Sequence, residues 1–313
     1  MTSESEESTL KESSLPAAYA AADEASIWWQ KRALLYLRLQ LLFGLAGAAT
    51  GLTSWRWRDT DVDLLAAVGV AGFLAALYFS ARLADGAALR RWYEARAAAE
   101  SLKTLAWRYA VRAEPFGMVE PETADGEFIR RSRDVLQQLQ TIDVALNPVG
   151  GDQITVPMRS LRAASLDSRR DAYRRGRVED QIEWYRAKAE AHARSQRKWA
   201  RVTILANAFA IAGAVPRVLG IVQVDVLGIL ATVAGSATAW SQARQHGSLV
   251  AAYSLAEHEL RLVVAVLPTI DAEARWAEFA ADAEEAISRE HTMWLASRVA
   301  RTISGNETTH RSA

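Results

Sequence analysis

The sequence predicts an all-α membrane protein in which two two-span helical hairpins, arranged as a tandem repeat, are extended by long cytoplasmic helices. Three observations support this fold class: long uncharged runs, tryptophans and arginines at the ends of these runs, and an ordered similarity between the two halves of the chain. The four uncharged runs are Leu39–Trp55, Leu64–Ala81, Val202–Pro216 and Val226–Ala243.

The length of these runs suits a membrane span. A bilayer core of about 30 Å needs roughly 20 mostly apolar helical residues, and the first, second and fourth runs come close to this length. The third is the weakest, because Pro216 and Arg217 interrupt it. It spans only if the proline lies at a helix end and the arginine reaches the surface. The alternative is that the runs are buried helices of a soluble all-α protein.

Tryptophans mark the expected membrane interfaces, where the ring is buried and its N–H stays wet. Trp199 opens the third run and Trp240 closes the fourth, so an antiparallel hairpin brings both to one interface. Trp55 and Trp57 lie between the first two runs and are expected at the opposite interface.

Basic residues flank the outer ends of both hairpins. They are Lys31, Arg32, Arg38, Arg82, Arg90, Arg91 and Arg96 in the first half, and Arg194, Arg197, Lys198, Arg201 and Arg244 in the second. The loops inside the hairpins carry fewer, and in the first loop three aspartates offset them. Because positive residues concentrate on the cytoplasmic side, both chain termini are expected in the cytoplasm.

Composition excludes several function classes. The 37 basic and 37 acidic residues give no net charge, so a nucleic-acid partner held by bulk charge is not expected. The absence of cysteine removes disulfides, thiolate metal sites and cysteine nucleophiles. The five histidines lack the spacing of a metal-hydrolase helix, and no glycine-rich run has the context of a phosphate loop. We therefore expect no enzyme activity, cofactor or metal.

The two halves are similar along their length. The spacing of Glu24 to Trp28 recurs in Asp180 to Trp184, and the triplet at 70–72 recurs at 233–235. We expect a disordered N-terminus at 1–14, a first two-span unit at 15–118, a linker with one amphipathic helix at 119–157, a second two-span unit at 158–301 and a disordered tail at 302–313.

A family resemblance rests on the segment that follows the first hairpin. Its residues 91–96 (Arg-Trp-Tyr-Glu-Ala-Arg) lead into Ala106-Trp107-Arg108-Tyr109 and end in Glu114-Pro115-Phe116. With the hairpin before it, this segment resembles the SLATT family of bacterial two-transmembrane effector domains, and the second half resembles another member. The resemblance implies a pore-forming or membrane-perturbing effector of the bacterial inner membrane, with a nucleotide-signal or sensor protein as partner.

The helices outside the runs carry charges of opposite sign. From Met158 to Arg201 there are 13 basic and 6 acidic residues, a net charge of +7, whereas 6 basic and 9 acidic residues between Ser241 and Arg301 give −3. If the fourth run turns back along the third, the two stretches pair through exposed ion pairs worth about 0–1 kcal/mol each. The alternative for the basic stretch is an anionic-lipid or nucleotide-phosphate site.

Small and polar residues inside the runs are the candidate site residues. Gly47 and Gly51 are four residues apart and predict a close helix–helix contact, as do Ala231, Gly235 and Ala239. Polar candidates for the interior of the bundle or a pore are Asn207, Thr203, Thr232 and Ser236. Asn207 is the strongest, because a mid-span amide must find a partner or face water.

Three function classes remain open. The first is an oligomeric membrane effector that conducts and is gated through its cytoplasmic helices. The second is a membrane-anchored scaffold or sensor that conducts nothing. The third is a soluble all-α interaction protein, which follows only if the apolar runs are core helices.

Overall fold

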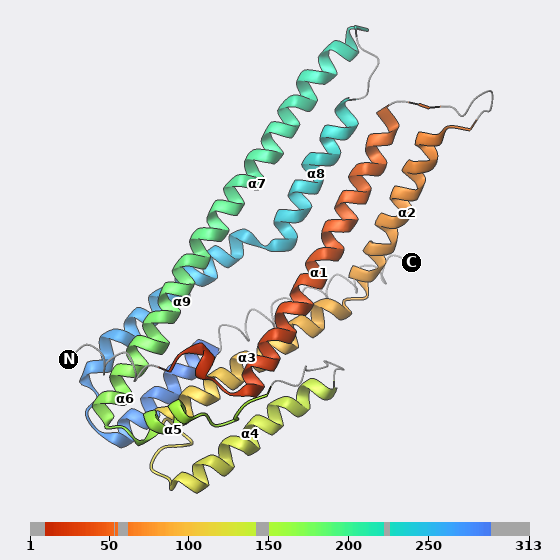
Figure 1. Ribbon diagram of the computed structural model, residues 1–313. Helices are drawn as coiled ribbons and strands as arrows, with labels where there is room; N and C mark the ends of the chain where they lie inside the picture. Colours follow the sequence, from red (N-terminus) through yellow and green to blue (C-terminus); the bar gives the residue numbers. More distant parts are fainter. Residues whose placement is uncertain (1–9, 53, 56–61, 142–149, 222–225, 289–313) are drawn as a thin grey trace, which may run out of the picture. The chain divides into compact units, whose positions relative to one another are not determined.

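A computed structural model describes residues 10–52, 54–55, 62–141, 150–221 and 226–288 of the chain. The regular structure of these residues is helical, which confirms the predicted fold class (Figure 1). The helices are α1 (Ala17–Ala49), α2 (Leu64–Ala84), α3 (Ala87–Ala110), α4 (Pro121–Thr141), α5 (Val156–Ala163), α6 (Leu166–Tyr173), α7 (Asp180–Val218), α8 (Val226–Arg244) and α9 (His246–Val266). Residues 273–288 form a further helix, and a π-helical turn, Arg174–Glu179, joins α6 to α7.

The chain divides into two compact units that do not follow its linear order. Unit 1 consists of Met1–Trp29, Arg90–Ala187 and Ala252–Ala313, and unit 2 consists of Gln30–Leu89 and Lys188–Ala251. Each unit therefore takes residues from both halves of the predicted repeat.

Unit 1 has an aromatic core. The ring of Tyr173 packs edge-on against Trp107 at 5.9 Å and against Trp276 at 5.7 Å, and all three side chains are buried. The amphipathic helix predicted in the linker is α4, which buries Phe128 and Leu139 in this core. It starts at Pro121, because proline is compatible with the first turn of a helix.

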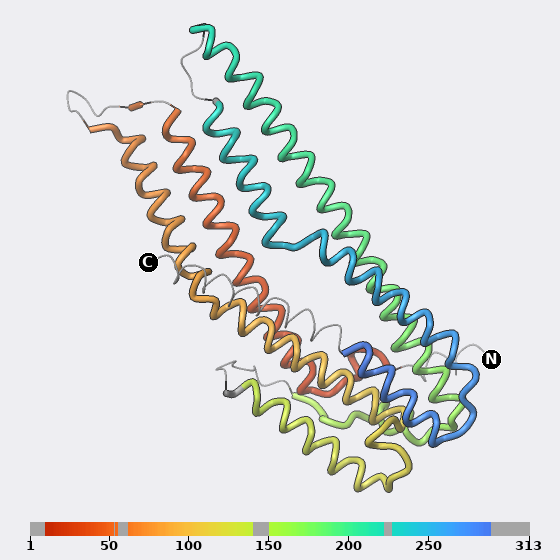
Figure 2. The backbone as a smooth tube through the Cα atoms, turned by 180° about the vertical axis from the view of Figure 1, so that it is seen from behind, coloured from red at the N-terminus to blue at the C-terminus, as the bar shows by residue number. Residues whose placement is uncertain are grey.

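Unit 2 contains the two hairpins, α1 with α2 and α7 with α8 (Figures 1 and 2). The carboxylate of Asp63 caps α2 by accepting hydrogen bonds from the backbone N–H groups of Leu65 and Ala66, at 3.0 and 3.2 Å. This agrees with the capping role that its position before the run suggests. Asp225, in the corresponding place before α8, lies outside the described residues.

The third run is a continuous helix, contrary to the interruption expected at Pro216. Helix α7 continues through Pro216 and Arg217 to Val218. It ends where Gly220 adopts a positive φ of 71°, with the N–H of Ile221 donating to the carbonyl of Pro216 at 2.9 Å. This termination satisfies the last carbonyls, and a proline so near the helix end costs only one backbone hydrogen bond.

Three of the described helices are long and apolar enough to cross a membrane by length and composition. They lie within Ala17–Leu52, Leu64–Ala84 and Leu166–Val218. The third run is thus part of a helix that is long and apolar enough to cross a membrane. Helix α8, which contains the fourth run, is not among these three helices. The order of strength expected from the sequence is reversed. Helix α8 is long enough, with 19 residues, but polar residues such as Gln242 lower its mean hydropathy.

Candidate membrane-spanning site

The seam of the first hairpin is built around three glycines. A Cβ atom at Gly72 would lie 3.2 Å from the Cα of Gly47 and 3.2 Å from the carbonyl oxygen of Phe43. One at Gly47 would lie 3.1 Å from the ring of Phe73, and one at Gly69 would collide with the hydroxyl of Thr50. Helices α1 and α2 therefore approach through backbone, as small residues allow in a bilayer.

The structure places the two glycines of the predicted pair differently. Gly47 lies in the seam, whereas Gly51 follows α1 in a short 3-10 turn, Thr50–Leu52, and a Cβ atom there would meet nothing within 4 Å. Gly69 and Gly72 were not among the predicted packing residues. Their spacing in an apolar run is the signal that could have revealed them.

The seam of the second hairpin consists of alanines. Ala206 and Ala210 on α7 are buried, as are Ala234 and Ala237 on α8. The small residues predicted for this contact lie beside it: Ala231 and Gly235 are exposed, and Ala239 is half-buried. A Cβ atom at Gly235 would meet nothing within 4 Å, so Gly235 makes no close helix contact within the described part of the chain.

The predicted polar residues make local hydrogen bonds. The amide of Asn207 donates to the carbonyl of Thr203 at 2.8 Å, and the Thr232 hydroxyl donates to the carbonyl of Gly228 at 2.8 Å. Thr203 and Thr238 bring their hydroxyls within 3.5 Å of each other across the two helices. Ser236 is half-buried, and Asn207 is exposed on α7.

Large apolar side chains remain exposed along both hairpins. Within the apolar windows of the three long helices, at most 11% of the residues are buried. The exposed side chains are Leu42, Phe43, Val68, Val70, Phe73, Leu74, Leu77 and Tyr78 in the first hairpin and Ile204, Leu205, Phe209, Ile211 and Val215 in the second. These runs are therefore not core helices of the single chain, and a contiguous apolar surface of this kind is typical of contact with lipid or another chain.

The tryptophans of the second hairpin lie together, as an antiparallel pairing requires. The rings of Trp199 and Trp240 are 6.2 Å apart. Trp55 is 63% exposed beyond the end of α1, and Trp57 lies outside the described residues.

Unit 1 contains a buried charge network that sequence reasoning missed. The guanidinium of Arg177 donates to both carboxylate oxygens of Glu284 at 2.8 Å, and Tyr173 donates to the same carboxylate at 3.0 Å. Arg169 pairs with Glu273. The expected pairing of the basic and acidic stretches thus occurs. Exposed pairs were expected, however, whereas the side chains of Arg177 and Glu284 are no more than 1% accessible and that of Glu273 is 37% accessible. The difference arises because residues 273–288 form part of the core of unit 1.

Other arginines of unit 1 bind backbone carbonyls. Buried Arg162 donates to the carbonyls of Tyr109 and Phe116 at 3.0 and 2.9 Å. Arg169 donates to the carbonyl of Val111 at 3.0 Å, and the Trp276 indole donates to the same oxygen at 2.7 Å. These bonds satisfy the carbonyls at and just beyond the end of α3, which have no helical partner. Arg162 and Arg169 of the basic stretch thus stabilise the fold of unit 1 by binding these carbonyls.

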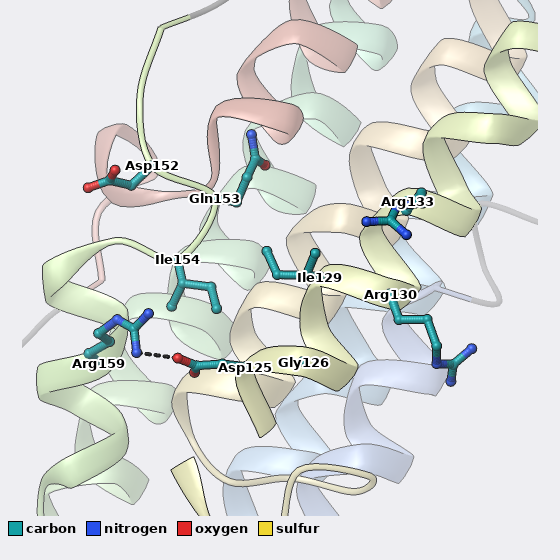
Figure 3. A pocket seen from close by; sticks show the side chains of 9 residues that line it. All are labelled: Asp125, Gly126, Ile129, Arg130, Arg133, Asp152, Gln153, Ile154 and Arg159. Atoms are coloured by element: carbon teal, nitrogen blue, oxygen red, sulfur yellow. Dashed lines mark hydrogen bonds and ion pairs between the residues drawn. The ribbon is translucent and has the colours of Figure 1, made fainter. Parts of the chain in front are cut away.

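A cavity of about 510 Å³ lies in unit 1, between α4 and the segment before α5. Figure 3 shows the side chains that line it. Its lining residues are Asp125, Gly126, Ile129, Arg130, Arg133, Asp152, Gln153, Ile154 and Arg159. Arg159 pairs with Asp125 and Arg130 pairs with Glu127, so two of the three arginines are neutralised by carboxylates. The cavity therefore offers little free positive charge to an anion.

Two groups beside this cavity have shifted pKa values. Burial, together with the hydrogen bond to Asp125, raises the pKa of Tyr109 to about 12. Hydrogen bonds from Arg130 and Arg131 lower the pKa of Glu127 to about 2. Both shifts follow from local pairing and burial and so indicate no reaction chemistry. Among the described residues, no group of three or more histidine, aspartate or glutamate side chains could hold a metal ion.

Comparison with protein families accounts for both halves of the chain. Residues 16–170 match the model of the SMODS and SLOG-associating 2TM effector domain 3, and residues 173–294 match that of the SMODS and SLOG-associating 2TM effector domain 1. The chain belongs to the SLATT family. The two SLATT matches follow each other in tandem, and the first includes α4, which we had set apart in a linker. No curated protein and no solved structure matches this SLATT chain.

The SLATT matches and the two compact units divide the chain differently. The boundary between the matches falls at residues 171–172, within α6, whereas unit 1 takes its core from both SLATT domains. Contacts in this core join residues of the two domains: the Trp276 indole donates to the carbonyl of Val111 at 2.7 Å, and Arg169 pairs with Glu273. The tandem SLATT domains therefore share the core of unit 1.

Proposed function

We propose that this SLATT protein is an oligomeric effector of the bacterial inner membrane, which forms a pore or perturbs the bilayer in a conflict or defence system. In this proposal both hairpins cross the membrane, both termini are cytoplasmic, and unit 1 carries the gating signal. A nucleotide-signal or sensor protein is the proposed partner. Four short spans in one chain are too few for an aqueous channel, so self-association is part of the proposal.

The observation that carries this proposal is the exposure of Asn207. It lies on α7 among exposed Ile204, Leu205 and Ile211, in a run with no charged residue. Its N–H₂ group is bonded to its own helix, but an amide facing hydrocarbon is costly. A neighbouring chain or water in a conduit would stabilise it.

The proposal predicts that Asn207→Leu lowers ion flux more than Thr203→Val does. An interhelical hydrogen bond in a membrane is worth about 1 kcal/mol, so we expect about a five-fold loss for Asn207→Leu. Flux is measured on protein reconstituted in vesicles, after a carbonate wash of expressing cells has shown that both variants are inserted.

The alternatives give different results in the same experiment. Wild-type protein that resists the wash but gives no flux is a membrane-anchored scaffold or sensor. Protein that the wash releases is a soluble interaction protein, which would contradict the membrane assignment. Equal and negligible effects of the two substitutions on a conducting protein would remove Asn207 from the bundle interior.

A further inference from the structure

Two arginines of unit 2 are stacked on aromatic rings. The guanidinium carbon of Arg38 is 5.4 Å from the ring centre of Trp240, and that of Arg82 is 6.0 Å from the ring centre of Tyr36. Arg32 joins the second cluster, since its Nε donates to the Tyr36 hydroxyl at 2.8 Å. Arg38 and Arg82 are both exposed.

These arginines lie at the same end of the apolar runs. Arg38 immediately precedes the first run and Arg82 immediately follows the second. Antiparallel pairing of α1 and α2 sets them at this level, since Phe79 stacks on Phe43 at 5.9 Å and lies 6.0 Å from Tyr36. When an apolar run is long enough to cross the hydrocarbon core of a bilayer, the side chains at its ends lie at the depth of the lipid phosphates.

The surroundings of these arginines differ from those in unit 1. In the part of the chain that the structure describes, neither Arg38 nor Arg82 forms an ion pair, although Asp85 attracts Arg82 from a distance. Arg169 and Arg177 in unit 1, by contrast, are held by carboxylates. Arg82 is also hydrogen-bonded to the Tyr36 hydroxyl. A guanidinium has five N–H donors, so stacking and one such bond fix its plane and leave further N–H groups for a phosphate, which binds through two hydrogen bonds.

We propose that Arg38 and Arg82 form a headgroup site that binds the phosphate of anionic phospholipids at one membrane surface. Tyr36 and Trp240 hold the two guanidinium groups, and Arg32 adds a third positive charge. The proposal depends on the hairpins lying in a bilayer, but not on conduction. It gives the protein a preference for membranes rich in anionic lipid.

The test supplies purified full-length protein in detergent with equal amounts of phosphatidylglycerol and phosphatidylcholine. The lipid that remains bound is counted by native mass spectrometry. Wild type is expected to retain phosphatidylglycerol preferentially. Since a basic residue near an anionic surface is worth about 1 kcal/mol, each of Arg38→Gln and Arg82→Gln should reduce the preference about five-fold, and the double variant about 25-fold.

The matched control is Arg133→Gln, which removes an exposed arginine of α4 in unit 1 and should leave the preference unchanged. If the double glutamine variant fails to fold, the double lysine variant, which keeps both charges but loses the two-pronged geometry, is expected to show about a five-fold loss. The proposal is overturned if wild type shows no preference, if either double variant keeps the wild-type preference, or if excess inorganic phosphate displaces the lipid. A carbonate wash and a flux measurement on the same variants report separately on insertion and conduction.

Discussion

The ion pair of Arg177 and Glu284 shows what single residues contribute to unit 1. Both side chains are removed from water. The carboxylate of Glu284 accepts hydrogen bonds from Arg177 and Tyr173, whereas the Nη1 atom of Arg177 is buried without a hydrogen-bond partner among the described residues. Burial of two charges gains little in itself, because desolvation offsets their attraction. Loss of one partner destabilises the fold, because the remaining charge is then buried without compensation.

We expect Glu284→Gln to lower the free energy of unfolding by about 3–5 kcal/mol, because it leaves the Arg177 charge buried and unpaired. Replacing both partners, as in Arg177→Met with Glu284→Leu, should recover most of this loss. The measurement is denaturant unfolding followed by circular dichroism.

The control for this prediction is Glu190→Gln. Glu190 and Arg194 form an exposed pair at 3.5 Å, so the substitution should cost less than about 1 kcal/mol. An effect of Glu284→Gln as small as that of Glu190→Gln would mean that the buried pair is solvated in solution.

At the scale of helices, backbone contact holds α1 against α2. Gly47, Gly69 and Gly72 leave no room for a side chain between the two axes. Helices in lipid gain little from burial, since the acyl chains are as apolar as leucine, so close approach and hydrogen bonding supply the association. The hydroxyl of Thr50, which lies against Gly69, donates within its own segment to the carbonyl of Gly47 at 2.8 Å.

Gly72→Leu should therefore separate the two helices and destabilise the first hairpin by about 1–3 kcal/mol, the usual cost of overpacking. Gly44→Leu is the control, since a Cβ atom there meets nothing within 4 Å. The measurement is thermal unfolding of the detergent-solubilised protein. Equal destabilisation by both substitutions would indicate general misinsertion rather than loss of the seam.

Gly51→Leu tests the other member of the predicted glycine pair. Because Gly51 has open space around it within the chain, we expect little change in the stability of the hairpin. A decrease in the mass of the detergent-solubilised assembly, without loss of stability, would show that Gly51 packs against another chain.

At the scale of the whole molecule, the boundaries of the tandem domains differ from those of the compact units. Two SLATT domains follow each other along the chain, but each compact unit contains parts of both. The four apolar runs lie in unit 2, where charged residues are found outside the runs, and the buried ion pair of Arg177 with Glu284 lies in unit 1. This separation by polarity is what a membrane boundary imposes, because exposed charges are excluded from the hydrocarbon region.

Topology can be tested with single cysteines, since the chain contains none. Ser54 follows the end of α1, Ser168 lies in α6, and both are exposed. We expect Ser54→Cys to react with an impermeant reagent applied outside intact spheroplasts, and Ser168→Cys to react only after lysis. The reverse pattern would invert the orientation derived from the arginines.

The residues within each helix were enough to determine much of this protein. The hydrophobic runs predicted where the hairpins lie, and short motifs indicated the SLATT family. The position of Asp63 before the second run suggested that it caps the helix that follows. Such features depend on residues close together in the chain, whose energetic effect is local. The third run meets the condition stated for it, since Pro216 lies in the last turn of α7, where a proline is less disruptive than in a helix interior.

Only the tertiary structure decided which faces meet. The rotation of α8 about its axis, which selects Ala234 and Ala237 over the neighbouring small residues, depends on how side chains of two helices interlock. The pairing of Arg177 with Glu284 joins residues 107 positions apart, and nothing in the charge pattern distinguishes them from the exposed arginines and acids nearby. Burial is a property of the packed unit, so the sequence could indicate that the two stretches attract, but not which pair would lie in the core.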